Sequence, residues 1–166
     1  MMETRLSKRT FLGSAAAALG AFALPACAKR GEARSVERFE VMKTPAEWKR
    51  QLGPARYAVL REEDTERAGS SPLDQEKRKG TYVCAGCALP LYSSATKFES
   101  GTGWPSFFKP LANAVRTKPD RGLFGTRTEV HCRRCGGHIG HVFDDGPKPT
   151  GKRYCMNGLA MKFVVA

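Results

Sequence analysis

Alternating apolar and polar positions dominate the chain from Gly80 onward. Six short runs rich in aromatic and β-branched residues are separated by Gly, Pro or Asp: "TYVC", "TKFES", "NAVRT", "TRTEVHC", "HIGHVF" and "LAMKFVVA". A period of two with turn residues between the runs is typical of antiparallel strands. The pattern therefore predicts a mainly β domain.

Helical signals precede this region. In "TPAEWKRQLG", Thr44 can serve as the N-cap, Pro45 fits the first helical position, Glu47 completes a capping box and Gly53 ends the helix. "PARYAVLREED" follows as a second helix with an apolar side, and "SPLDQEK" repeats the Ser-Pro start as one or two turns. We therefore expect short N-terminal helices before the strands.

Residues 1–28 have another pattern, which is typical of an export signal. Three basic residues precede the apolar run "FLGSAAAALGAFAL", which is shorter than the roughly 20 residues that span a bilayer. "ACA" then supplies small residues for cleavage, and "SKRTFLG" resembles the twin-arginine signature with Lys8 in the place of the first Arg. We predict an exported, periplasmic protein.

The rest of the chain divides into a polar, charged linker at residues 29–40 and one domain at residues 41–166. Cys27, in "LPAC", offers an alternative to simple cleavage. If this cysteine is lipidated, the exported protein is anchored to the membrane.

The formal net charge of +12 stays strongly positive without the signal. The electrostatic field of a strongly positive protein favours acidic binding partners. The basic residues are nevertheless scattered, with no block of five or more, and a nucleic-acid footprint needs clustering. We therefore expect a solvated basic surface and no nucleic-acid partner.

Four of the six cysteines form two Cys-x-x-Cys pairs, "CAGC" and "CRRC" (Cys84, Cys87, Cys132 and Cys135). Each pair can direct two thiolates at one point, and two pairs make a tetrahedral four-sulfur site suited to Zn²⁺. Structural disulfides and redox-active dithiols are alternatives, but two strained local disulfides fit the spacing less well. The predicted zinc would join distant strands and would be structural.

Cys155, in "GKRYCMNG", has no such partner. A lone thiol is either inert core filling or a nucleophile. Arg153 and Asn157 each lie two residues away and so share its side of a strand, where the arginine charge can stabilise a thiolate. These neighbours favour a nucleophile.

The stretch "GGHIGHVFDDGP" places His138 and His141 near the glycine-rich end of a strand, followed by Asp144 and Asp145 at a turn. A single histidine is more often structural than catalytic. Two histidines close to a free thiol, an arginine and carboxylates favour catalysis. His131, beside the second cysteine pair, is expected to be structural.

Trp104 lies in "GTGWPSFF", a tight Gly-Trp-Pro turn. A tryptophan at such a turn is either a core residue or an exposed flat wall. As a wall, the indole suits a small methyl-bearing group.

Together these motifs resemble the methionine-R-sulfoxide reductase B family. "CAGC", "FESGTGWPSF", "CRRCGGHIGHVFDDGP" and "RYCMNGLAMKF" occur in the family's order, from about residue 41 to the C-terminus. The resemblance implies two antiparallel sheets in a β-tent-like arrangement, with a zinc ion bound by two cysteine pairs remote from the active site. It also implies reduction of methionine-R-sulfoxide, free or protein-bound.

The resemblance further implies that Cys155 attacks the sulfoxide sulfur and becomes a sulfenic acid. Sulfoxide oxygen leaves only when it is protonated, so the site needs a general acid. His138 and His141 match the family's histidines and are the candidates, with Asn157 and Asp145 to orient them.

In the same scheme Arg153 helps to hold the thiolate and Trp104 holds the substrate's methyl group. Because the methyl wall and the acid lie on fixed sides of the sulfur, only one sulfoxide epimer fits.

Thr102 departs from the family's pattern. Many members carry a cysteine in this Ser-Gly-x-Gly-Trp-Pro loop, and that cysteine closes a disulfide with the catalytic one. No second redox cysteine remains in the domain. We therefore expect an external thiol, such as a thioredoxin-like protein, to reduce the Cys155 sulfenic acid, in preference to Cys27.

Two other functions compete. A zinc-ribbon-like module that binds nucleic acid or protein would use the cysteine pairs and the charge, but it leaves Cys155, Trp104 and the histidine pair unexplained. A cysteine hydrolase with Cys155 and His141 lacks a recognisable oxyanion hole. We expect a monomeric enzyme.

Overall fold

A computed structural model describes residues 38–122 and 125–166 of the protein. The predicted export signal, Cys27 and most of the predicted linker lie outside the described residues. Within those residues, no helix has the length and apolar character that a membrane span requires.

The first element, α1 (Pro45–Glu62), consists of two helical pieces joined at Gly53. Thr44 caps it, and the backbone N–H of Thr44 donates to the Glu47 carboxylate at 2.8 Å, which completes the predicted capping box. Gly53 has φ +71°, a left-handed conformation that glycine adopts at no steric cost. The two predicted helices are therefore present as the two pieces of α1, separated by the non-helical Gly53.

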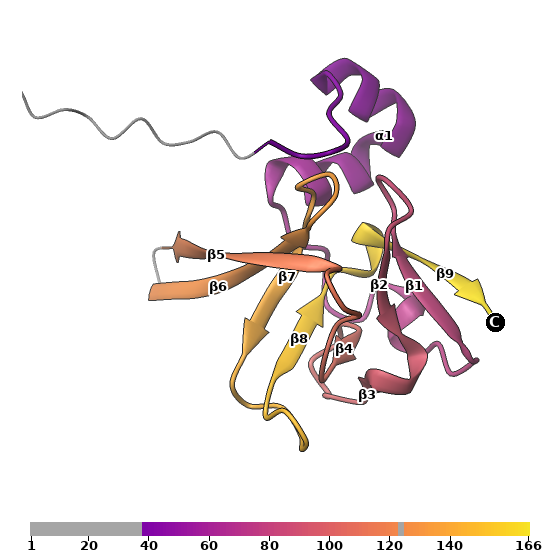
Figure 1. The fold of residues 1–166 in the computed structure, drawn as a ribbon, viewed down its shortest axis with the longest axis vertical. Helices are drawn as coiled ribbons and strands as arrows, with labels where there is room; N and C mark the ends of the chain where they lie inside the picture. Colours follow the sequence, from indigo (N-terminus) through magenta and orange to yellow (C-terminus); the bar gives the residue numbers. More distant parts are fainter. Residues whose placement is uncertain (1–37, 123–124) are drawn as a thin grey trace, which may run out of the picture. The chain divides into compact units, whose positions relative to one another are not determined.

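The strands form two antiparallel sheets, as predicted (Figure 1). The three-stranded sheet has the order β2–β1–β9, and the six-stranded sheet has the order β3–β4–β8–β7–β6–β5. Their bounds are β1 Gly80–Cys84, β2 Pro90–Ser93, β3 Lys97–Phe98, β4 Ser106–Phe107, β5 Val115–Gly122, β6 Gly125–Cys132, β7 His138–Phe143, β8 Arg153–Met156 and β9 Met161–Val165. Three short 3₁₀ turns are also present in the described residues: η1 Pro72–Asp74 lies between α1 and β1, η2 Ser94–Thr96 between β2 and β3, and η3 Gly158–Ala160 between β8 and β9.

Aromatic side chains from both sheets make the centre of the core. Tyr92 of β2 stacks on Phe107 of β4 with ring centroids 4.4 Å apart, and Tyr82 of β1 meets the same ring edge-on at 4.8 Å. The Tyr92 hydroxyl also donates to the sulfur of Met156 at 3.0 Å. Met156 directly follows Cys155, so this packing fixes the strand that carries the lone thiol.

Residues at the end of the predicted linker contact the turn that carries the second cysteine pair. The Phe39 ring packs edge-on against His131, with centroids 5.9 Å apart, and Glu40 pairs with Arg133. The same ring fills the space where a Cβ at Gly136 would lie, at 2.3 Å. Glycine is therefore required at that turn, which also has φ +66°.

Candidate active site and metal centre

Cys155 lies near the middle of the six-stranded sheet, on β8. It faces His141 on β7 and Ser106 on β4 in the strand register. Its half-buried side chain borders a cavity of about 120 Å³. The lining comes from segments far apart in the sequence: Thr65, Trp104, Arg127, Gly140, His141, Phe143, Cys155 and Asn157.

His138 and His141 lie three residues apart in β7, a spacing that puts side chains on opposite faces of a regular strand. The register with β6 shifts here, because Val130 pairs with Gly140 whereas His131 pairs with His138. The extra residue, Ile139, makes a β-bulge that re-aims the neighbouring side chains. The two imidazole rings consequently lie 5.3 Å apart, centroid to centroid.

Asn157 holds this bulge in place. Its backbone N–H and its side-chain amide both donate to the carbonyl of Ile139, at 2.8 and 3.1 Å. Its side-chain oxygen accepts from the backbone N–H of Glu66 at 3.0 Å. Asn157 therefore acts on the histidines through the backbone between them, and it also borders the cavity.

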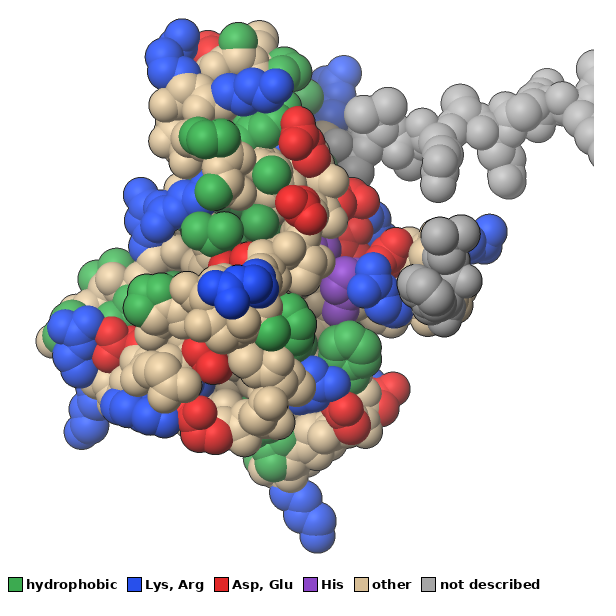
Figure 2. Space-filling model, turned by 180° about the vertical axis from the view of Figure 1, so that it is seen from behind, with side chains coloured by type: hydrophobic (Ala, Val, Ile, Leu, Met, Phe, Trp, Pro, Cys, Tyr) green, Lys and Arg blue, Asp and Glu red, His purple; other side chains and the backbone are tan. Residues whose placement is uncertain are grey.

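Asp120, on β5, is the carboxylate that contacts His141. Its Oδ2 lies 2.8 Å from Nε2 of His141 and 2.7 Å from the guanidinium of Arg127. Burial lowers the pKa of His141, and the Asp120 carboxylate opposes that shift. The hydrogen bond with His141, aided by Arg127, holds the pKa of Asp120 below its usual value. Figure 2 shows histidine side-chain atoms at the surface beside basic and acidic groups.

Glu129, on β6, is the corresponding carboxylate for His138. Both side chains are almost fully buried, and Nδ1 of His138 lies 3.2 Å from Oε1 of Glu129. Lys118 lies 2.9 Å from the other carboxylate oxygen and 2.8 Å from Glu63. Burial raises the pKa of Glu129, but His138 and Lys118 outweigh burial and lower it overall. A charged chain thus leads from the surface to the histidine pair.

Arg153 and Asp145, both predicted site residues, pair with each other. Two hydrogen bonds of 2.8 Å join the guanidinium to the carboxylate, and this pairing lowers the pKa of Asp145. It also raises the pKa of Arg153, with a further contribution from Cys155. The guanidinium lies over the ring of Phe143 at 4.5 Å. Asp145 therefore contacts the arginine beside the thiol, whereas the histidines have Asp120 and Glu129.

Trp104 lines the cavity, and a hydrogen bond to the backbone fixes its indole ring. Its indole N–H donates to the backbone carbonyl of Glu66 at 3.1 Å. The buried Glu66 carboxylate accepts from the backbone N–H groups of Gly158 and Leu159, at 2.5 and 2.9 Å. Glu66 therefore ties the indole to the backbone that follows Cys155.

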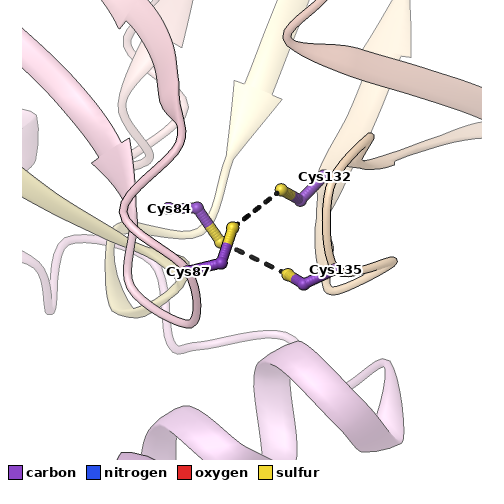
Figure 3. Close-up of side chains that lie close together, drawn as sticks. All are labelled: Cys84, Cys87, Cys132 and Cys135. Atoms are coloured by element: carbon purple, nitrogen blue, oxygen red, sulfur yellow. Dashed lines mark hydrogen bonds between the residues drawn. The ribbon is translucent and has the colours of Figure 1, made fainter. Parts of the chain in front are cut away.

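The four remaining described cysteines form one cluster, in which all four sulfur atoms lie within 4.8 Å of one another (Figure 3). Across the cluster, Cys84 lies 3.7 Å from Cys135 and Cys87 lies 3.5 Å from Cys132. A tetrahedral zinc site with bonds of about 2.3 Å has sulfur atoms about 3.8 Å apart. The described cysteines form no disulfide. The donor set and its spacing fit a bound metal ion.

Helix α1 braces both cysteine turns. Gln51 donates to the carbonyl of Gly86 at 2.7 Å, and Arg61 donates to the carbonyl of Cys135 at 2.9 Å. The first turn joins β1 to β2 and the second joins β6 to β7, so the cluster links the two sheets. None of the four cysteines lines the cavity beside Cys155. The cluster therefore has a structural position.

Several site residues were not predicted from the sequence. Only the strand register and the packing of loops bring these residues to the site. They are the histidine partners Asp120 and Glu129, the cavity-lining residues Thr65, Arg127 and Phe143, and Glu66, which holds the indole of Trp104. A weak signal exists for Glu129, because it is a carboxylate inside an alternating strand run, where it must be buried or paired.

Comparisons with known proteins agree on one family. The SelR domain matches residues 52–165. The peptide methionine sulfoxide reductase MsrB of Leptospira interrogans is 50% identical over 126 residues, which are 75% of this chain and 96% of that protein. The MsrB of Methanosarcina barkeri is 54% identical over 124 residues, 74% of this chain and 87% of that protein.

One solved structure, the Mis18 "Yippee-like" domain, matches 54% of this chain and 98% of its own length with a TM-score of 0.45 and 18% identity. This similarity is too low to bear on function.

Proposed function

From the premise that the chain belongs to the SelR domain family, the B-type methionine sulfoxide reductases, we propose that Cys155 is the nucleophile of a thiol-dependent reduction of methionine-R-sulfoxide. One observation carries the proposal. Cys155 and His141 occupy facing register positions on β8 and β7, and both border the cavity that Trp104 lines.

In the first step, the Cys155 sulfur attacks the sulfoxide sulfur. The oxygen passes to the cysteine, whose sulfur is oxidised, while the methionine sulfur is reduced to a thioether. His141, supported by Asp120, donates the proton that the sulfoxide oxygen needs, and the thiol releases one in exchange. A thiol and a sulfoxide thus become a sulfenic acid and a thioether without net proton uptake.

The site contains elements that suit only one epimer. Trp104 offers a flat apolar wall for the methyl group, and its indole is fixed by the hydrogen bond to Glu66. His141 approaches the cavity from β7. A sulfoxide whose methyl lies on the indole then presents its oxygen to the imidazole in only one configuration.

The sulfenic acid is proposed to be reduced by an external thiol, such as a thioredoxin-like protein. Thr102 directly precedes the Gly-Trp-Pro turn, and its Oγ1 lies 3.8 Å from the Cys155 sulfur. The other described cysteines all belong to the four-sulfur cluster. No described cysteine outside that cluster is available to form an intramolecular disulfide with Cys155.

Zinc is the metal that we propose for the cluster, held by Cys84, Cys87, Cys132 and Cys135. Four buried or half-buried thiols at tetrahedral spacing leave no open position for substrate. Bound zinc would supply a cross-link between the two sheets and no chemistry at the cavity.

The rival function, a zinc-ribbon-like binding module, is not favoured, because the relatives over most of the chain are sulfoxide reductases. We also propose that the protein is exported to the periplasm, for which residues 1–28 provide the support, and that it acts as a monomer.

The proposal is tested with resolved R and S epimers of N-acetylmethionine sulfoxide and dithiothreitol as reductant. The wild type is expected to reduce the R epimer, and Cys155→Ser to lose that activity while its metal content is unchanged. Equal activity of Cys155→Ser and the wild type would rule out this assignment.

A further inference from the structure

Thr102 is aimed at the Cys155 sulfur by the backbone on either side of it. Gly101 and Gly103 have φ values of +71° and +85°, so the chain turns sharply before and after the threonine. A Cβ at Gly103 would lie 2.8 Å from the backbone nitrogen of Gly69, which packs against this loop. The resulting distance of 3.8 Å between Thr102 Oγ1 and Cys155 Sγ is within hydrogen-bonding range for sulfur.

Two serine hydroxyls continue from Thr102 into the protein. The Ser100 hydroxyl lies 2.8 Å from that of Thr102 and 2.7 Å from that of Ser106. The Ser106 hydroxyl is 3.1 Å from the backbone carbonyl of Trp104, to which it can only donate. Ser106 is almost fully buried and pairs with Cys155 across β4 and β8.

The fixed carbonyl sets the direction of these hydrogen bonds. Since Ser106 donates to it, Ser106 accepts from Ser100, and the Ser100 proton is thereby used. Thr102 can then donate either to Ser100 or to the sulfur of Cys155. A thiol can donate to Thr102, whereas a thiolate can only accept, so ionisation of Cys155 turns the Thr102 proton toward the sulfur. A hydrogen bond to the charged form favours that form.

Charged groups also surround the sulfur. Arg153 lies on β8 itself and interacts with Cys155, although Asp145 pairs with its guanidinium. His141 faces the thiol from β7, with Asp120 and then Arg127 beyond it. Each of these charged groups contributes to the electrostatic potential at the Cys155 sulfur. From β4 the facing residue is the uncharged Ser106.

We propose that Thr102 is a catalytic residue whose hydroxyl turns from Ser100 to the Cys155 sulfur when Cys155 ionises, and so stabilises the thiolate by a hydrogen bond. The position that could otherwise hold a resolving cysteine thus serves the first half of the reaction. This inference rests on the proposed function only in taking Cys155 as the nucleophile.

The test is the pH dependence of iodoacetamide alkylation at Cys155 in the full chain, followed by peptide mass spectrometry so that the other cysteines do not interfere. In Thr102→Val, which keeps the shape and removes the hydroxyl, the midpoint of alkylation is expected to lie at a higher pH than in the wild type. Thr102→Ser is expected to restore the wild-type midpoint. An unchanged midpoint in Thr102→Val would overturn the proposal, and so would a Thr102→Ser midpoint as high as that of Thr102→Val.

Ser100→Ala gives a second test that leaves Thr102 in place. Ser100 is the competing acceptor for the Thr102 proton, so its loss leaves the Cys155 sulfur as the acceptor, and the midpoint is expected to fall below that of the wild type. A wild-type midpoint in this variant would contradict the role of the hydroxyl chain, even if Thr102→Val failed to fold. Reduction of the R-sulfoxide by the wild type is measured separately, so failure of this inference and failure of the proposed function give different results.

Discussion

Nε2 of His141 lies 2.8 Å from Oδ2 of Asp120, which joins β7 to the outermost strand of the six-stranded sheet. Burial lowers the pKa of His141, and this carboxylate works against the shift by stabilising the imidazolium. Its removal in Asp120→Asn therefore lowers the pKa of His141 further. As the general acid must be protonated, kcat should begin to fall at a lower pH than in the wild type.

The measurement for Asp120→Asn is the pH profile of kcat, with a loss of about 10- to 100-fold expected at neutral pH. Asp144→Asn is the matched control, because this exposed carboxylate pairs with Lys152 on the surface. A profile of Asp120→Asn whose alkaline limb coincides with that of the wild type would refute the pairing's role.

The four-cysteine cluster predicts a separate stability effect. Cys132→Ser removes one ligand, and the metal content should fall from about one zinc per chain to near zero, with a marked drop in Tm. Elemental analysis and calorimetry measure both. Cys155 lies outside the cluster, so the variant Cys155→Ser should keep its zinc. Full zinc occupancy in Cys132→Ser would argue against this ligand set.

Trp104 sets the apolar side of the cavity. Trp104→Ala removes the wall, so kcat/KM for the R epimer should fall by about 10- to 200-fold and the preference over the S epimer should narrow. Trp104→Phe keeps a flat but smaller ring and loses the N–H bond to Glu66, so a smaller loss is expected. Steady-state kinetics with both resolved epimers measures these changes. If Trp104→Ala preferred the R epimer over the S epimer as strongly as the wild type does, the role of the indole in binding the methyl group would be contradicted.

The buried Glu66 carboxylate accepts two backbone N–H groups, from Gly158 and Leu159. In Glu66→Gln one acceptor becomes an amide donor that faces an N–H group, so the free energy of unfolding should decrease by about 1–3 kcal/mol. Urea titration measures the change. Glu63→Gln is the control, since that side chain is 56% exposed and its ion pair with Lys118 contributes little. If the two variants had the same free energy of unfolding, the Glu66 carboxylate would not stabilise the backbone at Gly158 and Leu159 as inferred.

The local part of the fold could be predicted from the sequence. The capping box at Thr44, the break at Gly53 and most of the longer strands follow from signals within a few residues. The two strands that were not predicted, β2 and β4, have four and two residues. Runs of this length are too short to show a period of two. These strands form because they pair with longer strands next to them in the sheet.

The site residues likewise fall into those that the sequence indicates and those that only the fold brings together. Cys155, the histidines and Trp104 stand out by residue type, whereas Asp120 and Glu129 reach the histidines only through the register of β5, β6 and β7. The bulge at Ile139 is likewise a property of pairing between strands. Asp145 lies closer to His141 in sequence, yet its carboxylate contacts Arg153. Proximity along the chain did not identify the contacting carboxylate.

The central claim is that the Cys155 sulfur takes the oxygen of the sulfoxide. The most direct measurement is a single turnover with one equivalent of R-sulfoxide and no reductant, followed by dimedone labelling and peptide mass spectrometry. The account predicts one methionine formed per chain and a sulfenic acid on the Cys155 peptide. Methionine formed while the Cys155 peptide keeps an unmodified thiol would contradict it.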